Sequence, residues 1–165
     1  MRRLPLLPLL LAPLLALFSL LASAADFLEP EQAFRLSARA AGPDVVELRF
    51  EIAPGYYLYR ERFSATSTEA TLGDIALPAG HVKFDETFQK EVETYRELLT
   101  VQVPVQAATG PFTLLVGSQG CADAGLCYPP ATQALRVSLA AFGGDGSLRV
   151  LASPDATGGG LLAGA

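Results

Sequence analysis

Residues 45–52 read Val-Val-Glu-Leu-Arg-Phe-Glu-Ile, a strict alternation of apolar and charged side chains from Val46 onward. Successive side chains of a β-strand point to opposite faces, so Val46, Leu48 and Phe50 would share one face and the charged residues the other. The stretch therefore predicts a strand with one buried face and one solvated face.

The same period of two recurs in four further segments of the chain. These are residues 34–39, 99–105, 112–116 and 135–139. Turn-forming residues such as Gly42-Pro43-Asp44 separate them, and no segment has the caps and spacing of a convincing helix. We therefore predict an all-β fold, a β-sandwich with Phe34, Phe50 and Phe112 in its core.

Two stretches have ambiguous patterns. The three tyrosines of Tyr56-Tyr57-Leu58-Tyr59 cannot share one face of a strand, so at least one ring is expected at a surface or cleft. The plainer alternative is a strand with one buried and two rim tyrosines. In residues 83–96 the apolar positions are spaced by four, four and three, which also fits a short amphipathic helix. Because strand alternation follows directly, we predict an irregular loop there.

The N-terminus has the pattern of a secretory signal peptide. Arg2 and Arg3 precede an apolar run, and Ala22-Ser23-Ala24 is the small-residue pattern that a signal peptidase accepts. The run is almost long enough for an uncleaved membrane anchor, but its prolines favour cleavage after Ala24. We expect a signal peptide over residues 1–24 and a mature chain in an exported, oxidising compartment.

The mature chain is acidic. Without the leader, ten lysines and arginines stand against seventeen acidic residues, a net charge of −7. This balance argues against nucleic acid or anionic lipid as a partner. The length fits one domain, which we place at residues 25–140, followed by a flexible glycine-rich tail at residues 141–165.

Both cysteines lie in the stretch Gln119-Gly120-Cys121-Ala122-Asp123-Ala124-Gly125-Leu126-Cys127-Tyr128-Pro129-Pro130. A disulfide needs Cα atoms about 5.5 Å apart, whereas six extended steps span about 20 Å, so a bonded pair requires the segment to curl back. Small and turn-forming residues permit this, and Gly125 can take a positive φ. We predict a compact loop, bounded by glycine and proline, in which the two sulfurs can meet.

The spacing alone leaves the role of the cysteines open. A structural cross-link is the default in an exported domain. Against it, so short a loop yields only about 2–3 kcal/mol of stabilisation, and a loop position eases exchange with a partner thiol. Carboxylates of Asp85, Glu86 or Asp123 near the pair would raise a thiol pKa. A zinc site that includes His81 is disfavoured, because closed zinc sites use four protein ligands.

Four motifs follow one another in a characteristic order and spacing. They are Gly55-Tyr56-Tyr57-Leu58-Tyr59-Arg60, Asp85-Glu86-Thr87-Phe88, Tyr95-Arg96 and, most specific of all, residues 119–130. Over roughly Phe27 to Leu139, the chain resembles the N-terminal periplasmic domain of DsbD-type thiol:disulfide interchange proteins. The resemblance implies an immunoglobulin-like sandwich in the periplasm, and neither a cofactor nor a metal is expected.

The resemblance implies thiol–disulfide exchange as the activity. The cysteine pair would receive electrons from a membrane-embedded DsbD-type donor and its thioredoxin-like module. It would then reduce periplasmic thioredoxin-fold proteins such as disulfide isomerases and cytochrome c maturation factors. Cys127 would form the mixed disulfide with a partner, and Cys121 would resolve it. The alternative is a non-redox immunoglobulin-like binding or assembly module, whose structural disulfide would resist mild reduction.

The resemblance also implies a loop that caps the cysteine pair. We expect this cap at residues 85–89, with Phe88 as the ring that shields the sulfurs from wrong oxidants. The expected site-lining or capping residues are Asp85, Glu86, Phe88, Tyr57, Tyr59, Asp123 and Tyr128. DsbD proteins continue into a membrane domain and a thioredoxin domain that this sequence does not contain. We expect either a fragment or a stand-alone carrier whose membrane partner is a separate polypeptide.

Overall fold

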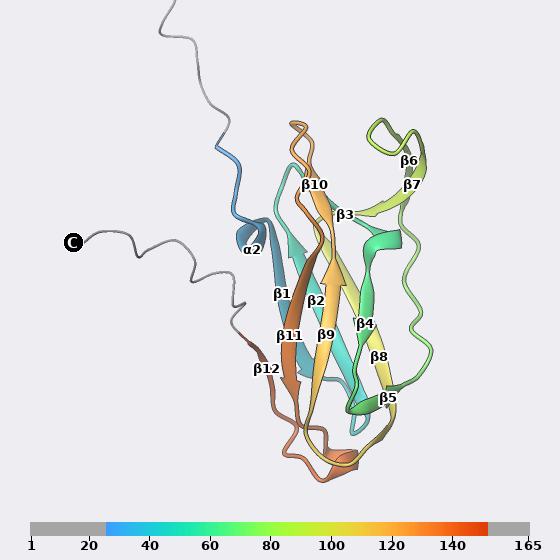
Figure 1. Ribbon diagram of the computed structural model, residues 1–165, viewed down its shortest axis with the longest axis vertical. Coiled ribbons are helices and arrows are strands. Elements are labelled where there is room, and N and C mark those ends of the chain that lie inside the picture. The colour runs from blue at the N-terminus through green and yellow to red at the C-terminus, as the bar shows by residue number, and fades with distance from the viewer. Residues whose placement is uncertain (1–25, 152–165) are drawn as a thin grey trace, which may run out of the picture.

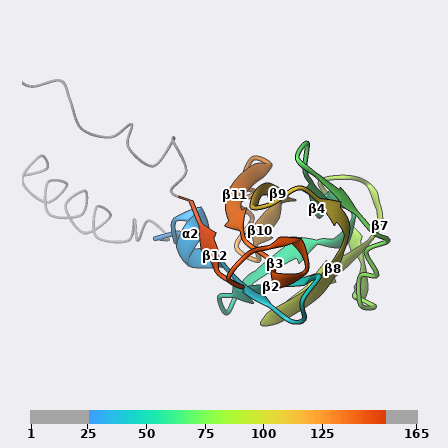
Figure 2. The same cartoon turned by 90° about the horizontal axis from the view of Figure 1, so that it is seen from below.

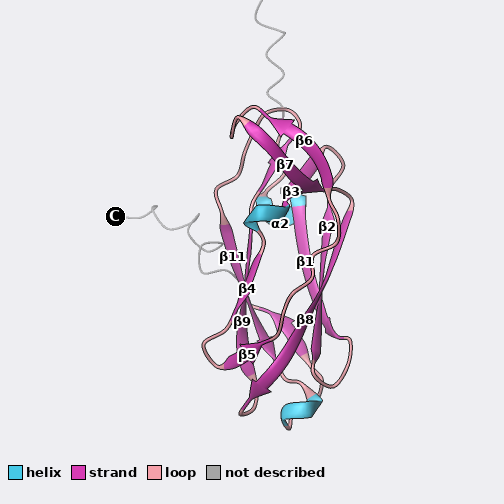
Figure 3. Cartoon of the chain, turned by 90° about the vertical axis from the view of Figure 1, so that its right-hand side faces the viewer, coloured by secondary structure: helices cyan, strands magenta, loops and turns pink. Residues whose placement is uncertain are grey.

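Strands make up nearly all of the regular structure in the computed structural model, which describes residues 26–151 (Figure 1). The strands are β1 (Phe34–Ala40), β2 (Val45–Ile52), β3 (Tyr56–Tyr59), β4 (Ser64–Thr66), β5 (Ala70–Leu72), β6 (His81–Asp85), β7 (Lys90–Tyr95), β8 (Leu98–Ala108), β9 (Phe112–Ser118), β10 (Gly120–Ala122), β11 (Ala131–Val137) and β12 (Leu148–Val150). Helical turns occur at α2 (Pro30–Ala33), η2 (Arg60–Arg62) and η3 (Ala140–Phe142) (Figure 3). The all-β prediction is confirmed.

Two antiparallel sheets form the layers of the sandwich. One sheet has the strand order β1-β2-β8-β5, and the other has the order β12-β11-β9-β4. Seen along the long axis of the molecule, β9 and β11 lie opposite β2 and β8 (Figure 2). This two-layer arrangement is the predicted immunoglobulin-like sandwich.

The core lies between these layers and follows the alternation in the sequence. Val46, Leu48 and Phe50 of β2 are fully buried, and their register partners on β8 are also apolar and buried. These partners are Val103, Val101 and Leu99. Burial of each large apolar side chain contributes about 1.5–3 kcal/mol. Phe34 and Phe112 are buried as predicted.

A smaller third sheet lies at one end of the sandwich, at the top of Figure 1. Its strand order is β10-β3-β7-β6. The register places Cys121 opposite Tyr57 and Tyr59 opposite Thr94. This sheet therefore brings the cysteine segment, the tyrosine segment and the β6–β7 hairpin together.

The β6–β7 hairpin differs from the irregular loop predicted for residues 83–96. Lys83 and Asp85 point to the inner face of the hairpin, and Asp85 is only 4% exposed. Val82 and Phe84 point outward and are 54% and 60% exposed. The strand has charged residues inside and apolar residues outside, so the usual rule for reading alternation did not identify it.

The ordered fold continues past the boundary expected at residue 140. Strand β12 pairs with β11, with Val150 opposite Leu135, so residues up to 151 belong to the sandwich rather than to a flexible tail. The backbone N–H of Gly146 donates to the carbonyl of Ser138, which closes the turn between the two strands. The predicted signal peptide and residues 152–165 of the predicted tail lie outside the described residues.

Candidate functional site

Cys121 and Cys127 form a disulfide within residues 120–128, here called the cysteine hairpin, and their Cα atoms are 4.0 Å apart. The N–H of Ala122 donates to the carbonyl of Leu126 at 2.7 Å, and Gly125 has a φ of +103°. A side chain at that φ would be strained, which is why a glycine suits the turn. The predicted compact loop is present, but Cys121 lies in strand β10 and not in a loop.

The two sulfur-bearing residues differ in exposure. Cys121 is 1% exposed and is buried in a small cluster with Tyr57, Tyr59 and Val92. Cys127 packs against the same cluster but remains partly exposed. Cys127 is therefore the more exposed of the two cysteines.

Tyr57 and Tyr59 lie beside the buried cysteine. They are 7% and 3% exposed, and their rings contact edge to face with centroids 5.4 Å apart. The Tyr59 hydroxyl oxygen is 3.2 Å from Cys121 Sγ. The alternative of two rim tyrosines is wrong, because β3 is covered on both faces and all of its residues are buried.

Asp85 is the buried carboxylate of the site. One of its oxygens accepts a 2.7 Å hydrogen bond from the Tyr59 hydroxyl, and the other accepts from the backbone N–H groups of Thr87 and Phe88. Burial alone would raise the pKa of Asp85, but these hydrogen bonds outweigh it and hold the pKa below its ordinary value. Asp85 is therefore an ionised acceptor at neutral pH. Glu86, in contrast, is exposed on the turn.

Phe88 lies on the turn between β6 and β7, within the segment expected to form the cap (residues 85–89). Its ring contacts the Tyr59 ring edge to face at 5.3 Å and lies 5.2 Å from the guanidinium carbon of Arg62. Phe88 and Cys127 are both packed against the cluster that holds Cys121. The Phe88 ring thus packs against the tyrosine cluster that surrounds Cys121, and its role as a shield for the sulfurs stays a prediction.

Asp123 lies on the cysteine hairpin, where it is paired with a cation. Its carboxylate accepts two hydrogen bonds from the Arg96 guanidinium, at 2.7 and 3.0 Å. These hydrogen bonds hold the pKa of Asp123 below its usual value. Arg96 and Lys83 also lie over the ring of Tyr57, at 5.1 and 3.5 Å from its centroid. In the sequence, Arg96 stood out only as part of a motif, and neither cation could be placed at the site, because the mixed charges of residues 83–96 do not indicate which of them face inward.

Tyr128 packs on the side of the cysteine hairpin that faces away from the cap. Its ring meets the ring of Phe34 edge to face at 5.6 Å and lies 6.3 Å from that of Tyr56. Burial, followed by a hydrogen bond with Tyr56, raises the pKa of Tyr128 to about 12. Its hydroxyl therefore remains protonated at any physiological pH.

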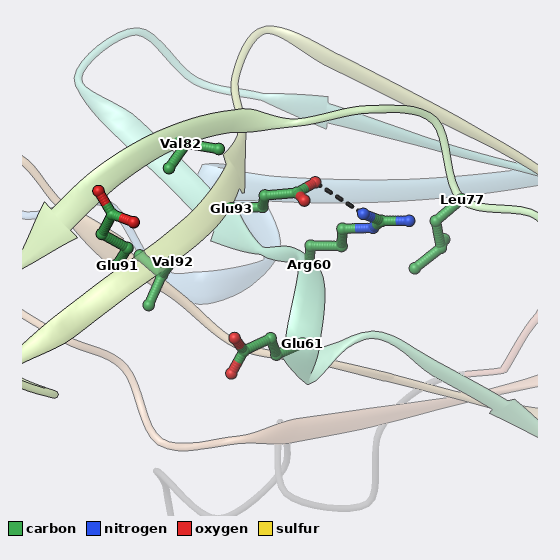
Figure 4. A pocket seen from close by; sticks show the side chains of 7 residues that line it. All are labelled: Arg60, Glu61, Leu77, Val82, Glu91, Val92 and Glu93. Carbon is green, nitrogen blue, oxygen red and sulfur yellow. Dashed lines mark hydrogen bonds and ion pairs between the residues drawn. The ribbon is translucent and has the colours of Figure 1, made fainter.

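A separate pocket of about 530 Å³ lies beside the β6–β7 hairpin (Figure 4). The lining residues are Arg60, Glu61, Leu77, Val82, Glu91, Val92 and Glu93. An ion pair of 2.8 Å between Arg60 and Glu93 spans it, and neither cysteine lines it. Within residues 26–151, this pocket included, no group of three or more His, Cys, Asp and Glu side chains is placed to hold a metal ion.

Comparison with known sequences and structures gives consistent matches. The family described as thiol:disulfide interchange protein DsbD, N-terminal, matches residues 24–139. DsbD of Ralstonia nicotianae is 50% identical over 143 residues, which are 86% of this chain and 24% of that protein. DsbD 2 of Pseudomonas aeruginosa is 45% identical over 114 residues, 69% of this chain and 19% of that protein. The chain thus spans about a quarter or less of the length of these relatives.

Two solved structures share the fold. The Neisseria meningitidis DsbD N-terminal domain in the reduced form is 32% identical, with a TM-score of 0.66 over 78% of this chain and 98% of that one. The DsbD N-terminal domain in its complex with the PilB N-terminal domain is 36% identical, with a TM-score of 0.58 over 67% of this chain and 87% of that one. The chain belongs to the family of DsbD N-terminal domains.

Proposed function

We propose that this domain is a redox carrier for thiol–disulfide exchange. It takes two electrons from a membrane-embedded DsbD-type donor with a thioredoxin-like module and passes them to thioredoxin-fold proteins in the periplasm. The observation that carries the proposal is the bonded cysteine pair, with Cys121 1% exposed and Cys127 partly exposed at one end of the sandwich. The names of the relatives support the chemistry, and the complex solved for one of them supports a protein as the partner.

Loading of the carrier begins at the exposed sulfur. A donor thiolate attacks Cys127 Sγ, the Cys121–Cys127 bond breaks, and Cys121 leaves as a thiolate that takes up a proton. The second donor thiol then attacks the mixed disulfide, and Cys127 is released as a thiolate. The donor is oxidised to a disulfide, and the domain gains two electrons. It gains one proton on Cys121, and a second proton once the Cys127 thiolate is protonated. Delivery to a substrate disulfide runs through the same steps in reverse.

The hydrogen bonds around Tyr59 assign different roles to the two sulfurs. Burial, together with hydrogen bonds to Tyr57 and Asp85, raises the pKa of Tyr59, so its hydroxyl stays protonated. Because this hydroxyl donates to Asp85, its oxygen is left to accept a hydrogen bond from a Cys121 thiol. The arrangement favours a protonated Cys121 and leaves Cys127 as the thiolate that attacks a partner.

The periplasmic location rests on the signal-peptide pattern of residues 1–24 and on the family. Within residues 26–151, no helix combines the length and the hydrophobicity needed to cross a bilayer. Mass spectrometry of the protein recovered from a periplasmic extract tests the location. A mature N-terminus at Ala25 is expected, and a chain that retains Met1 in the membrane fraction would contradict it.

A trapping experiment tests the exchange reaction. With Cys121→Ser, the resolving sulfur is absent, so Cys127 should accumulate a mixed disulfide with an oxidised thioredoxin-fold protein. Cys127→Ser is the matched control and should trap none, because its remaining thiol is buried. Trapping by neither variant would favour the alternative, a non-redox binding module with a structural disulfide.

A further inference from the structure

Both backbone polar groups of Leu28 are bound by tyrosine hydroxyls. The N–H of Leu28 donates to the Tyr56 hydroxyl at 2.9 Å, and its carbonyl accepts a short hydrogen bond from the Tyr128 hydroxyl. These bonds fasten residues 26–29, here called the N-terminal strap, which contain neither strand nor helix. The strap is thus tied to the folded domain by the two hydroxyls.

The two tyrosines are linked to the two halves of the cysteine hairpin, Tyr56 as a strand neighbour and Tyr128 as a member. Tyr56 pairs with Ala122, the residue after Cys121, and Tyr128 directly follows Cys127. Tyr56 alternates with Tyr57 along β3, so the strap lies on the face of the strand opposite to the cap. The hairpin is therefore held from both faces, by the cap on one and by the strap on the other.

Tyr128 is anchored at more than its hydroxyl. Its N–H donates to the carbonyl of Gly120 at 3.0 Å, and its own carbonyl accepts from the side-chain amide of Gln119 at 3.1 Å. Its ring packs on Phe34, which also lies directly against Gly120, since a Cβ there would meet the Phe34 ring at 2.5 Å. Loss of the hydroxyl alone would therefore loosen Tyr128 without displacing it from the fold.

We propose that Tyr128, fastened to the strap, is a positioning residue that keeps Cys127 within bonding reach of Cys121. The proposal rests on the exchange function proposed above. In the mixed disulfide, Cys127 Sγ is bonded to the partner, and Cys121 must reach it to complete the reaction. An anchor on the next residue limits how far Cys127 can move, which raises the effective concentration of one sulfur at the other. The anchor thus favours the internal disulfide over the open dithiol.

The test measures the equilibrium of the domain with glutathione. Two glutathione molecules supply two electrons and two protons, the Cys121–Cys127 bond breaks, and one glutathione disulfide forms. Tyr128→Phe removes the hydrogen bond to Leu28 and keeps the ring. We expect the equilibrium constant to shift about fivefold toward the dithiol, the effect of one lost hydrogen bond. For a two-electron couple this raises the reduction potential of the domain by about 20 mV. Tyr56→Phe should shift it in the same direction.

Tyr95→Phe is the matched control. Tyr95 is also a buried tyrosine whose hydroxyl donates to a backbone carbonyl, that of Pro78, at 2.7 Å, but this bond does not involve the cysteine hairpin. It should lower the free energy of unfolding by a similar amount and leave the redox equilibrium unchanged.

The possible results separate the two proposals. If the wild-type disulfide does not equilibrate with glutathione at all, the exchange function fails. If the wild type equilibrates and Tyr128→Phe has the same constant, or Tyr95→Phe shifts it equally, the exchange function stands and the positioning role of Tyr128 is overturned.

Discussion

At the scale of single residues, Asp85 is the most deeply buried charged group of the site. Its pKa is lower in the folded protein than in the unfolded chain, because Tyr59 and two backbone N–H groups donate to its ionised form. The stabilisation is therefore fully present above the ordinary aspartate pKa of about 3.9 and is lost as the pH falls through the lowered value.

Asp85→Asn tests this sign. We expect the wild type to exceed the variant in free energy of unfolding by a constant amount above about pH 5, and the difference to shrink below about pH 4. Urea denaturation of both proteins across this range measures the difference. An equal difference at pH 3 and pH 7 would rule out an ionised Asp85 as its source.

Phe88 is the residue that we expect to shield the sulfurs. Phe88→Ala removes the ring that packs against Tyr59 and should let dithiothreitol reduce the disulfide several-fold faster. Phe84→Ala is the control on the same hairpin, because Phe84 is 60% exposed on the opposite face. Stopped-flow measurement of the reduction rates of both variants tests this prediction. Equal rates would contradict a capping role for Phe88.

At the scale of elements, β10 depends on a close approach that only glycine permits. A Cβ at Gly120 would lie 2.4 Å from the carbonyl oxygen of Tyr57 and 2.5 Å from the Phe34 ring. Gly120→Ala should therefore destabilise the fold by about 1–3 kcal/mol. Gly42→Ala is the control, because a Cβ there makes only ordinary contacts at 3.9 Å. Thermal unfolding measures both, and equal stability of the two variants would contradict the close packing of Gly120 against Tyr57 and Phe34.

The sequence predicted the elements whose alternation has its usual meaning. Strand β2 is an example, because one of its faces is buried against the opposite layer and the other is charged. It did not predict β6, whose inner face carries Lys83 and Asp85, or the burial of β3 on both faces. Both strands belong to the small sheet around the cysteines. There the residues of the site do not follow the usual alternation of buried apolar and exposed polar side chains.

The prediction of the site shows the same division between local and long-range features. The compact cysteine loop follows from local residue types, so it could be predicted. The hydrogen bond between Tyr59 and Asp85 joins residues 26 positions apart, and that between Tyr128 and Leu28 joins residues 100 apart. Contacts of this range depend on how the strands pair, which no local pattern specifies.

At the scale of the whole molecule, we expect the core of the sandwich to keep the domain folded without its disulfide. The loop closed by the bond has a sequence separation of only 6, so reduction should lower the free energy of unfolding by about 2–3 kcal/mol and no more. Denaturation of the oxidised and reduced domains compares the two values. Global unfolding on reduction would contradict a carrier, which must be stable in both states.

The reduction potential of the Cys121–Cys127 pair tests the central claim most directly. Structural disulfides of exported proteins have potentials below about −300 mV and resist the glutathione pool, whereas exchanging pairs lie higher. Equilibration of the domain in a series of dithiothreitol and glutathione buffers, with mass spectrometry after alkylation, gives the value. A carrier should have a potential above about −300 mV, and a value below it would show that the bond is a permanent cross-link.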